Sequence, residues 1–220
     1  TGADLEFPHH TNEIAQSEAK TGKTFANYWM HNGFVNIDNV KMSKSLGNFI
    51  TVHDALKTID GQVLRFFFAT QHYRKPINFT EKAVRDAETN LKYLKNTYEQ
   101  PFTGEVDPAD LQGFVDKFIA AMDEDINAAN GITVVFELAK WINSGHYNQD
   151  VKDALTKMLE VFGVVFVEEV LDADIEALIA ERQEARAKKD FARADAIRDQ
   201  LAAQGIKLLD TKEGVRWTRD

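Results

Sequence analysis

The spacing of hydrophobic residues along the chain predicts a mainly helical protein. An amphipathic pattern begins at Asn12 and stops at Gly22, as expected for a short surface helix. Residues 61 to 70 are apolar on every side and contain Phe66-Phe67-Phe68, which favours a buried helix over a base-stacking surface. Longer helical patterns cover residues 81 to 99, 109 to 124, 128 to 143, 149 to 163 and 172 to 203, the last with a break near Asp190.

Two stretches of the chain predict small β elements instead. Short apolar runs on either side of Asp38-Asn39 indicate a hairpin formed by residues 33 to 37 and Val40. A second small hairpin is expected over residues 206 to 218. Residues 2 to 8 are expected to form a turn and a short extended piece, and residues 72 to 79 an irregular connection. Thr51 and Asp54 predict a capped helix that runs through Ile59. The predicted fold is therefore mainly α with small β elements.

Composition and charge narrow the class of protein. The 220 residues are 44% hydrophobic and contain no Cys, which excludes a disulfide framework and a thiolate nucleophile within this sequence. The net charge of −9 argues against a general nucleic-acid binder, yet residues 105 to 180 hold 16 Asp/Glu against 4 Lys/Arg, so the first and last segments remain possible contact surfaces. A cytoplasmic protein is the default prediction. Because Thr1 is not an initiator Met, we expect the C-terminal portion of a longer protein.

The run Lys41-Met42-Ser43-Lys44-Ser45 is the stretch with the clearest chemistry. It leaves the predicted hairpin and places two ammonium groups and two hydroxyls in a short segment before Gly47. Such donors suit the charge that develops on a triphosphate during displacement, where catalysis consists mostly of positioning and electrostatics. A solvated basic turn is the alternative interpretation of an arbitrary run of this composition.

The order K-M-S-K-S resembles the second signature of class I aminoacyl-tRNA synthetases. Together with Phe7-Pro8-His9-His10 and Leu46-Gly47-Asn48, it resembles the cysteinyl-tRNA synthetase family in particular. The resemblance covers the whole chain. It implies three domains: the C-terminal part of a Rossmann-type catalytic domain with the K-M-S-K-S loop and a stem-contact region (1–80), a helical bundle of the tRNA-binding type (81–170), and a small α/β anticodon-binding domain (171–220).

The resemblance also implies residues that handle the nucleotide. Lys41 and Lys44 are the expected catalytic residues, with Lys44 contacting the phosphates and Lys41 supporting it. Gly2 and Asp4 match a G-x-D element that contacts the ATP ribose, and Val35 matches a position whose backbone meets the adenine. From the bare residues alone, Gly2 and Asp4 form only a turn. The expected ATP-binding residues are therefore Gly2, Asp4, Val35 and Lys44, with ATP used together with Mg²⁺.

His9 and Glu13 lie four residues apart at a predicted helix start, so their side chains can reach one point. On spacing alone this is a capped helix with a surface His. The resemblance implies two zinc ligands at these positions, with two Cys ligands earlier in a longer chain and the metal recognising the substrate thiol. Thr11 departs from the usual motif, which has Glu there. With two ligands present, we expect a metal-free site or one completed by water or neighbours.

The C-terminal segment resembles the family's anticodon-binding domain. The resemblance implies that Arg186, Phe191, Asp195 and Asp210 read anticodon bases by stacking and hydrogen bonding. A helix laced with ion pairs is the alternative interpretation of this segment, and Phe191 also suits a core position. The run Met122-Asp123-Glu124-Asp125-Ile126-Asn127 resembles the start of the helical domain, and we interpret its acidic residues as capping the next helix.

The implied function is ATP-dependent activation of cysteine and its transfer to tRNA(Cys), by a cytoplasmic monomer. The other class I signature, His-x-Gly-His, does not occur in these 220 residues, so the chain by itself is expected to be inactive. One alternative is a ligase that joins cysteine to an amino sugar, as in mycothiol biosynthesis, although such an enzyme does not need the anticodon-binding segment. A noncatalytic tRNA-binding module is another alternative, for which the K-M-S-K-S run would be superfluous.

Overall fold

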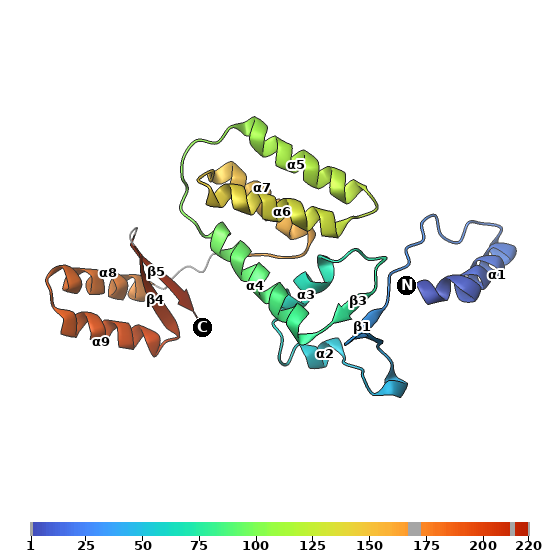
Figure 1. Cartoon of the computed structure of the whole chain (residues 1–220), viewed down its shortest axis with the longest axis horizontal. Coiled ribbons are helices and arrows are strands. Elements are labelled where there is room, and N and C mark those ends of the chain that lie inside the picture. The colour runs from blue at the N-terminus through green and yellow to red at the C-terminus, as the bar shows by residue number, and fades with distance from the viewer. Residues whose placement is uncertain (1, 167–172, 212–213, 220) are drawn as a thin grey trace. The chain divides into compact units, whose positions relative to one another are not determined.

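The computed structural model describes residues 2–166, 173–211 and 214–219. The chain divides into two compact units, Thr1–Phe166 and Val167–Asp220 (Figure 1). Each unit has its own hydrophobic core, and each is described by itself below. No helix among the described residues combines the length and the apolar character that crossing a bilayer requires.

Helices form most of the first unit. A 3-10 turn over Ala3–Leu5 and a helical turn over Glu6–His10 lead into α1, and a further 3-10 turn covers Lys44–Leu46. The α-helices are α1 (Thr11–Thr21), α2 (Val52–Ala55), α3 (Gly61–Ala69), α4 (Glu81–Tyr98), α5 (Pro108–Asp123), α6 (Ala128–Asn143) and α7 (Gln149–Val161). Their starts follow ordinary capping chemistry: for example, the Thr80 side chain accepts a hydrogen bond from the Ala83 amide before α4.

A small mixed sheet joins distant parts of the first unit. It consists of β1 (Val35–Ile37), β2 (Val40–Lys41) and β3 (Ile77–Phe79) in the order β2-β1-β3. The first two strands form an antiparallel hairpin in which Asp38 and Asn39 both have positive φ angles, of 48° and 66°. The third strand pairs in parallel with β1, with Val35 opposite Ile77. The sheet therefore fixes the hairpin against the segment that leads into α4.

One hydrophobic core runs from α3 through α7. Phe66 and Phe67 of α3 are 2% and 4% exposed, and Leu94 of α4 and Leu138 of α6 are fully buried. Full burial of a Leu or Phe side chain contributes about 1.5 to 3 kcal/mol. The aromatic triplet thus serves packing, as the sequence predicted. Because α3 shares its core with α6 and α7, it is attached to the helical bundle (α4 to α7) through the interior.

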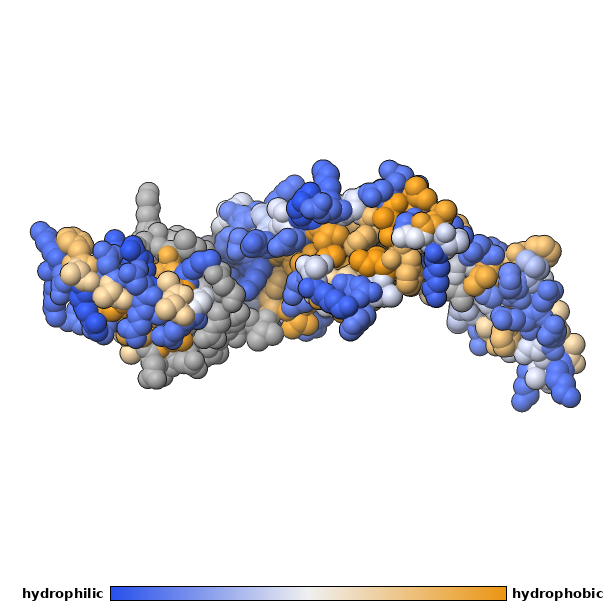
Figure 2. All heavy atoms as spheres, turned by 90° about the horizontal axis from the view of Figure 1, so that it is seen from below, coloured by the Kyte–Doolittle hydropathy of each residue, from blue (hydrophilic) through white to orange (hydrophobic). Residues whose placement is uncertain are grey.

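Apolar side chains also remain at the surface of the first unit. The face drawn in Figure 2 shows hydrophobic residues gathered over the part of this unit where α2, α3 and the sheet lie. Exposed apolar residues near the sheet include Val40, Leu46, Phe49, Val52 and Leu56. They flank the turn that carries the two lysines, so the polar groups of that turn are set in an apolar surface.

The second unit is a helix pair packed on a hairpin. It consists of α8 (Ala173–Ala187), α9 (Phe191–Ala202), β4 (Ile206–Thr211) and β5 (Gly214–Arg219), and the two strands are antiparallel. Its core is formed by Ile175, Ile197, Leu201 and Ile206, which are at most 4% exposed. Asp190 caps α9, and its side chain accepts a hydrogen bond from the Arg193 amide. This is the break predicted near Asp190.

The mainly helical fold with small β elements is confirmed, and three local predictions need correction. Ile77–Phe79 is a strand, whereas residues 72 to 79 were expected to be irregular. The helix capped by Thr51 ends at Ala55 and continues only as turns to Ile59. Residues 3 to 10 are helical turns, with only Phe7 in an extended conformation. In each case contacts from distant parts of the chain, or competing turn hydrogen bonds, override the local pattern.

Candidate functional site

The lysines at positions 41 and 44 lie in a tight turn, which we call the lysine turn (Lys41–Asn48). β2 ends at Lys41, and the 3-10 turn Lys44–Leu46 is closed by Gly47, whose φ of 69° is left-handed and suits glycine. The Asn48 side chain holds the two ends together: its oxygen accepts from the Ser43 amide at 2.9 Å, and its nitrogen donates to the Lys41 carbonyl at 3.2 Å. Local polar bonds thus define the turn.

The two ammonium groups of this turn are exposed. Lys44 begins the 3-10 turn, and its Nζ lies 5.5 Å from the centre of the Phe49 ring. Within the described residues it forms no ion pair, so it is available to an anionic ligand. Lys41 Nζ lies 4.0 Å above the Phe34 ring. The hydroxyls of Ser43 and Ser45 are 2.7 Å apart and hydrogen-bond to each other.

Asp4 and Lys41 meet although they are 37 residues apart. Lys41 Nζ lies 3.4 Å from Asp4 Oδ2, and both side chains are about half exposed. Exposed pairs of this kind contribute only about 0 to 1 kcal/mol, so a ligand can replace the contact. A Cβ atom at Gly2 would lie 2.5 Å from the Asp4 carboxylate, so the Asp4 side chain lies close against the Gly2 backbone. The structure therefore brings the G-x-D element and the lysine turn together.

Val35 lies in the central strand beside these groups. It is half-buried, and its carbonyl accepts a hydrogen bond from the Met42 amide at 3.1 Å. Gly2 forms a bridge to Asn32, and the Ala3 amide donates to the Asn32 carbonyl at 3.0 Å. Consequently Gly2 and Asp4 lie near the start of β1, and the lysine turn leaves its partner strand β2.

Two residues of the chain, His9 and Glu13, are the predicted zinc ligands. His9 lies in the helical turn before α1 and Glu13 in the first turn of α1, and both side chains are exposed. Among the described residues, no group of three or more His, Cys, Asp or Glu side chains is placed to hold a metal ion. Two donors do not complete a tetrahedral zinc site, so the described part of the chain does not fit the metal by itself.

The neighbouring His10 is buried and was not anticipated. It is 6% exposed, its Nδ1 lies 2.9 Å from Nε2 of His31, and its ring packs 5.2 Å from that of Trp29. The sequence offered no spacing signal for this pair, because the two histidines are 21 residues apart. The contact ties the start of α1 to the segment that precedes β1.

The predicted anticodon residues lie on the helix pair and hairpin of the second unit. Phe191 opens α9 and is 62% exposed, so it is not a core residue. Arg186, in the last turn of α8, and Asp195, on α9, are also exposed, and Asp195 lies 3.4 Å from Arg198. Asp210 lies in β4 opposite Val215, and its side chain is outside the described part of the structure.

Ion pairs also form on α8 and α9, as in the alternative interpretation of this segment as helices with surface ion pairs. Arg193 Nη2 lies 2.8 Å from Glu181, and Lys188 Nζ lies 2.5 Å from Glu184. The ammonium group of Lys188 lowers the pKa of the Glu184 carboxyl below its usual value. These pairs and the exposed Phe191 ring occupy one small unit, so ion pairs and an exposed aromatic side chain are both present.

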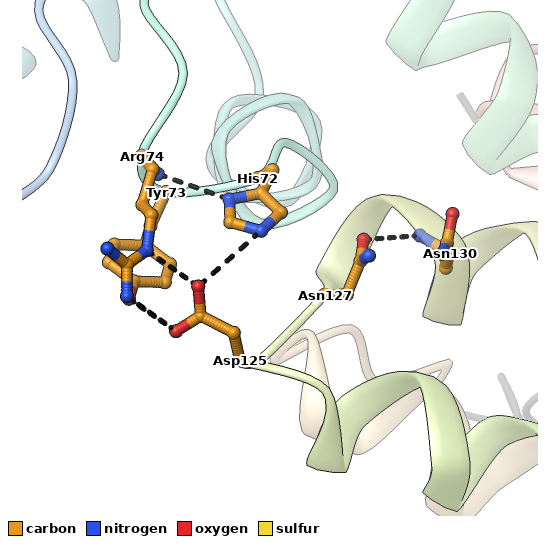
Figure 3. Close-up of polar contacts among 6 residues, drawn as sticks. All are labelled: His72, Tyr73, Arg74, Asp125, Asn127 and Asn130. Atoms are coloured by element: carbon orange, nitrogen blue, oxygen red, sulfur yellow. Dashed lines mark hydrogen bonds and ion pairs between the residues drawn. The ribbon is translucent and has the colours of Figure 1, made fainter.

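Sequence reasoning missed a polar cluster around Asp125. Its carboxylate accepts hydrogen bonds from Tyr73 and Arg74, which directly follow His72 in the connection after α3 (Figure 3). The acidic run was interpreted as helix capping, but the cap of α6 is Asn127, whose side chain accepts from the Asn130 amide at 3.1 Å. The acidic run Met122 to Asn127 was the sequence signal for this cluster, but nothing in the sequence indicated Tyr73 and Arg74 as its partners.

Three family models match the chain in succession. Residues 1–89 match the tRNA synthetases class I (C) catalytic domain, residues 117–168 the DALR domain, and residues 168–217 the cysteinyl-tRNA ligase anticodon binding domain.

Curated relatives are similar over the entire chain. It is 86% identical over 219 residues to the cysteine–tRNA ligase of Streptococcus pneumoniae serotype 4, 82% to that of Streptococcus mutans serotype c and 78% to that of Streptococcus thermophilus. Each match covers 100% of this chain and 49% of the relative, so the chain spans about half the length of these proteins.

A solved structure resembles the fold. The ternary complex of LeuRS, tRNA and LeuAMS from Agrobacterium radiobacter matches with a TM-score of 0.50 and 15% identity, over 75% of this chain and 26% of that one. At this identity the likeness concerns the fold alone. The three successive family models and the relatives at 78 to 86% identity show that the chain belongs to the cysteinyl-tRNA synthetase family.

Proposed function

We propose that this chain is the part of a cysteine–tRNA ligase that carries the lysine turn and the RNA-contacting units. In the proposed reaction the carboxylate of cysteine attacks the α-phosphorus of ATP and pyrophosphate leaves. The terminal hydroxyl of tRNA(Cys) then attacks the activated carbonyl and AMP leaves. ATP acts with Mg²⁺, and the protein works as a monomer in the cytoplasm.

The contact between Asp4 and Lys41 is the observation that carries this proposal. The G-x-D element and the lysine turn are separate in sequence, and their side chains lie 3.4 Å apart beside β1. A carboxylate next to the ammonium group of Lys41, with Lys44 in the same turn, suits a nucleotide, because the carboxylate accepts from ribose hydroxyls and the ammonium groups attract phosphate. In this role Asp4 and Gly2 position the ribose, and Val35 presents its backbone to the adenine.

Lys44 is the residue we assign to the phosphates. Its ammonium group is exposed at the start of the 3-10 turn, and Lys41 supports it once the nucleotide has replaced the Asp4 contact. Both groups act electrostatically, by attracting the charged phosphates. The absence of His-x-Gly-His from these 220 residues agrees with a division of the chemistry between this chain and the rest of a longer protein.

We propose that this chain supplies two ligands of a zinc site. His9 and Glu13 are chemically suited to the metal, and the remaining ligands would come from the additional length that the relatives have. Bound zinc would supply selectivity for the substrate thiol. The anticodon role of Arg186, Phe191, Asp195 and Asp210 is likewise proposed, and it is supported by the family model matched at residues 168–217. That match favours a tRNA ligase over an amino-sugar ligase.

Pyrophosphate exchange tests the proposal directly. We expect the full-length protein to catalyse exchange that depends on cysteine and is not supported by serine, and we expect this chain alone to be inactive. A full-length protein that forms no cysteine-dependent adenylate, but binds tRNA, would be a noncatalytic RNA-binding module. Exchange that proceeds with cysteine, followed by transfer to an amino sugar instead of tRNA, would support the amino-sugar ligase.

A further inference from the structure

The loop between α5 and α6 holds an unusual backbone conformation. Asp125 and Ile126 both have positive φ angles, of 57° and 52°. An Asp tolerates this region, but a β-branched Ile rarely adopts it. Backbone bonds maintain the conformation: the Asp125 amide donates to Asp123 and the Ile126 amide to Met122, each at 3.0 Å. Strained residues of this kind persist where the surrounding structure holds them and often serve a function.

This conformation directs the Asp125 carboxylate toward the connection after α3 (Figure 3). Tyr73 Oη donates to Oδ1 at 2.7 Å. Arg74 donates from Nε to Oδ2 at 2.6 Å and from Nη2 to Oδ1 at 3.0 Å. His72 Nε2 lies 4.0 Å from Oδ2. A two-pronged Arg–carboxylate contact fixes direction as well as distance. The guanidinium of Arg74, followed by the Tyr73 hydroxyl, lowers the pKa of Asp125, so the carboxylate is charged at neutral pH.

The connection that Asp125 holds is packed directly against the start of β1. The Gly33 amide donates to the Tyr73 carbonyl at 2.7 Å. A Cβ atom on Gly33 would lie 2.4 Å from the Lys75 backbone, so the two segments are in close contact. The next residue back, Asn32, accepts from the Ala3 amide at 3.0 Å. The side chain of Asp125 thus contacts residues 73–74, and residues 73–75 contact Gly33. Gly33 directly follows Asn32, which bonds to Ala3, so the Asp125 loop is connected to the elements that carry Gly2, Asp4 and Val35.

The cluster is not needed to hold the core together. α3 already shares the interior with α6 and α7, and the side chains of Asp125 and Arg74 are 43% and 63% exposed. Its hydrogen bonds instead join the α5–α6 loop of the helical bundle to the connection after α3. That connection contacts residues 2–48, which carry Gly2, Asp4, Val35 and the lysine turn and which we call the catalytic segment. The backbone bond between Gly33 and Tyr73 does not involve the carboxylate, so removing the Asp125 side chain leaves that contact in place.

We propose that Asp125 is a positioning residue that fixes the helical bundle against the catalytic segment, so that a tRNA held by the bundle presents its acceptor end to the adenylate. This inference rests on the proposed function. It predicts that the cluster matters for the transfer step, which uses tRNA, and not for adenylate formation, which uses ATP and cysteine alone.

The test compares Asp125→Ala with Glu124→Ala in the full-length protein. Glu124 is the adjacent exposed carboxylate, and within the described residues its side chain forms no hydrogen bond or ion pair, so its variant removes the same charge from the same loop. We expect Asp125→Ala to lower kcat/KM for tRNA about tenfold, as loss of a charge-assisted hydrogen bond allows. Pyrophosphate exchange should stay within about twofold of wild type, as should both activities of Glu124→Ala.

Arg74→Ala provides a second variant with an exposed side chain, in case Asp125→Ala does not fold. It should reproduce the selective loss of tRNA charging, and the double variant should be no worse than Asp125→Ala alone, because Asp125→Ala already removes the contact with Arg74. Equal tRNA charging by Asp125→Ala and Glu124→Ala would overturn the inference while leaving the proposed function intact. A parallel loss of exchange would also overturn it. A wild-type protein without cysteine-dependent exchange would instead refute the proposed function on which the inference rests.

Discussion

The side-chain oxygen of Asn48 accepts a hydrogen bond from the backbone amide of Ser43 at 2.9 Å. The same side chain donates to the Lys41 carbonyl, so a single amide closes the turn that carries both lysines. Neither lysine takes part in these bonds through its side chain. The backbone of the turn is thus fixed, while Lys44 forms no ion pair within the described residues and Lys41 is held only by its half-exposed contact with Asp4. This division suits phosphate binding.

Replacing Asn48 tests whether this closure matters. Asn48→Ala removes both the acceptor and the donor, so we expect adenylate formation to fall about tenfold, because the lysines are less well positioned. Asn48→Asp keeps the acceptor for the Ser43 amide and loses the donor, and it should fall between wild type and Ala. Pyrophosphate exchange on the full-length protein measures the effect. Equal rates for all three proteins would show that the turn needs no clamp.

Lys44 should contribute mainly to the chemical step. We expect Lys44→Ala to reduce cysteine-dependent pyrophosphate exchange by about 10² to 10³, the range seen when one group that stabilises transition-state charge is removed. Cysteine binding should be unchanged, since the amino acid does not need the phosphate contact. Lys92→Ala, which removes an exposed cation from α4, is the matched control. An exchange rate for Lys44→Ala equal to that of the control would remove Lys44 from the mechanism.

Phe191 should contribute to RNA affinity without supporting the fold. Its side chain is 62% exposed, and stacking of a base on an aromatic ring is worth about 1 to 3 kcal/mol. Phe191→Ala should therefore raise the KM for tRNA by about five- to 150-fold and leave pyrophosphate exchange and Tm unchanged. Phe191→Trp keeps an aromatic surface and should retain tRNA affinity. A lowered Tm for Phe191→Ala would instead mean that the ring has a structural role.

The parts of the fold that were predicted correctly depend on neighbouring residues. Thr51 caps the helix that follows it, the helical pattern breaks at Asp190, Asp38-Asn39 forms the hairpin turn, and Phe66 lies in the core, each as its local pattern indicates. Local capping and turn chemistry are encoded within a few residues, which makes them readable from sequence.

The parts that were missed depend on residues far apart in the chain. β3 exists because Ile77 pairs with Val35, and a three-residue run gives no independent signal for that. Asp125 contacts Arg74, 51 residues away, so its acidic run was assigned to the nearer helix start. For the site, the resemblance named Asp4 and Lys41, but only the fold brings the two side chains to 3.4 Å.

The Asp125 cluster also predicts a pH dependence of stability. The pKa of the Asp125 carboxyl lies below the ordinary Asp value of 3.8, chiefly because Arg74 and then Tyr73 donate hydrogen bonds to the carboxylate. A carboxyl whose pKa is lowered by folding stabilises the folded state when the pH is above the pKa of the unfolded state. This contribution is lost as the pH falls through the lower pKa of the folded state. Wild type should therefore exceed Asp125→Asn in Tm at pH 7, and the difference should shrink below pH 4. A difference that is constant between pH 7 and pH 3 would contradict this assignment.

The shared core of α3 to α7 gives a stability prediction. Leu138 is fully buried in α6, and Leu138→Ala should destabilise the first unit by about 2 to 5 kcal/mol, because it leaves a cavity among close-packed side chains. Ile119→Ala, at a position on α5 that is 50% exposed, is the matched control and should cost much less. Thermal or denaturant unfolding of the full-length protein checks the difference. Similar losses for both variants would mean that the interior repacks around the missing side chain.

The parallel pairing of β1 with β3 has a consequence during synthesis. Residues 35–37 leave the ribosome well before residues 77–79, so the newly made chain first carries its lysine-bearing segment on a hairpin of two very short strands. An isolated hairpin of this kind is only marginally stable in water. The nucleotide-contacting groups thus reach their final arrangement only after α3 and the strand that follows it have emerged, which makes this region late to mature in the growing polypeptide.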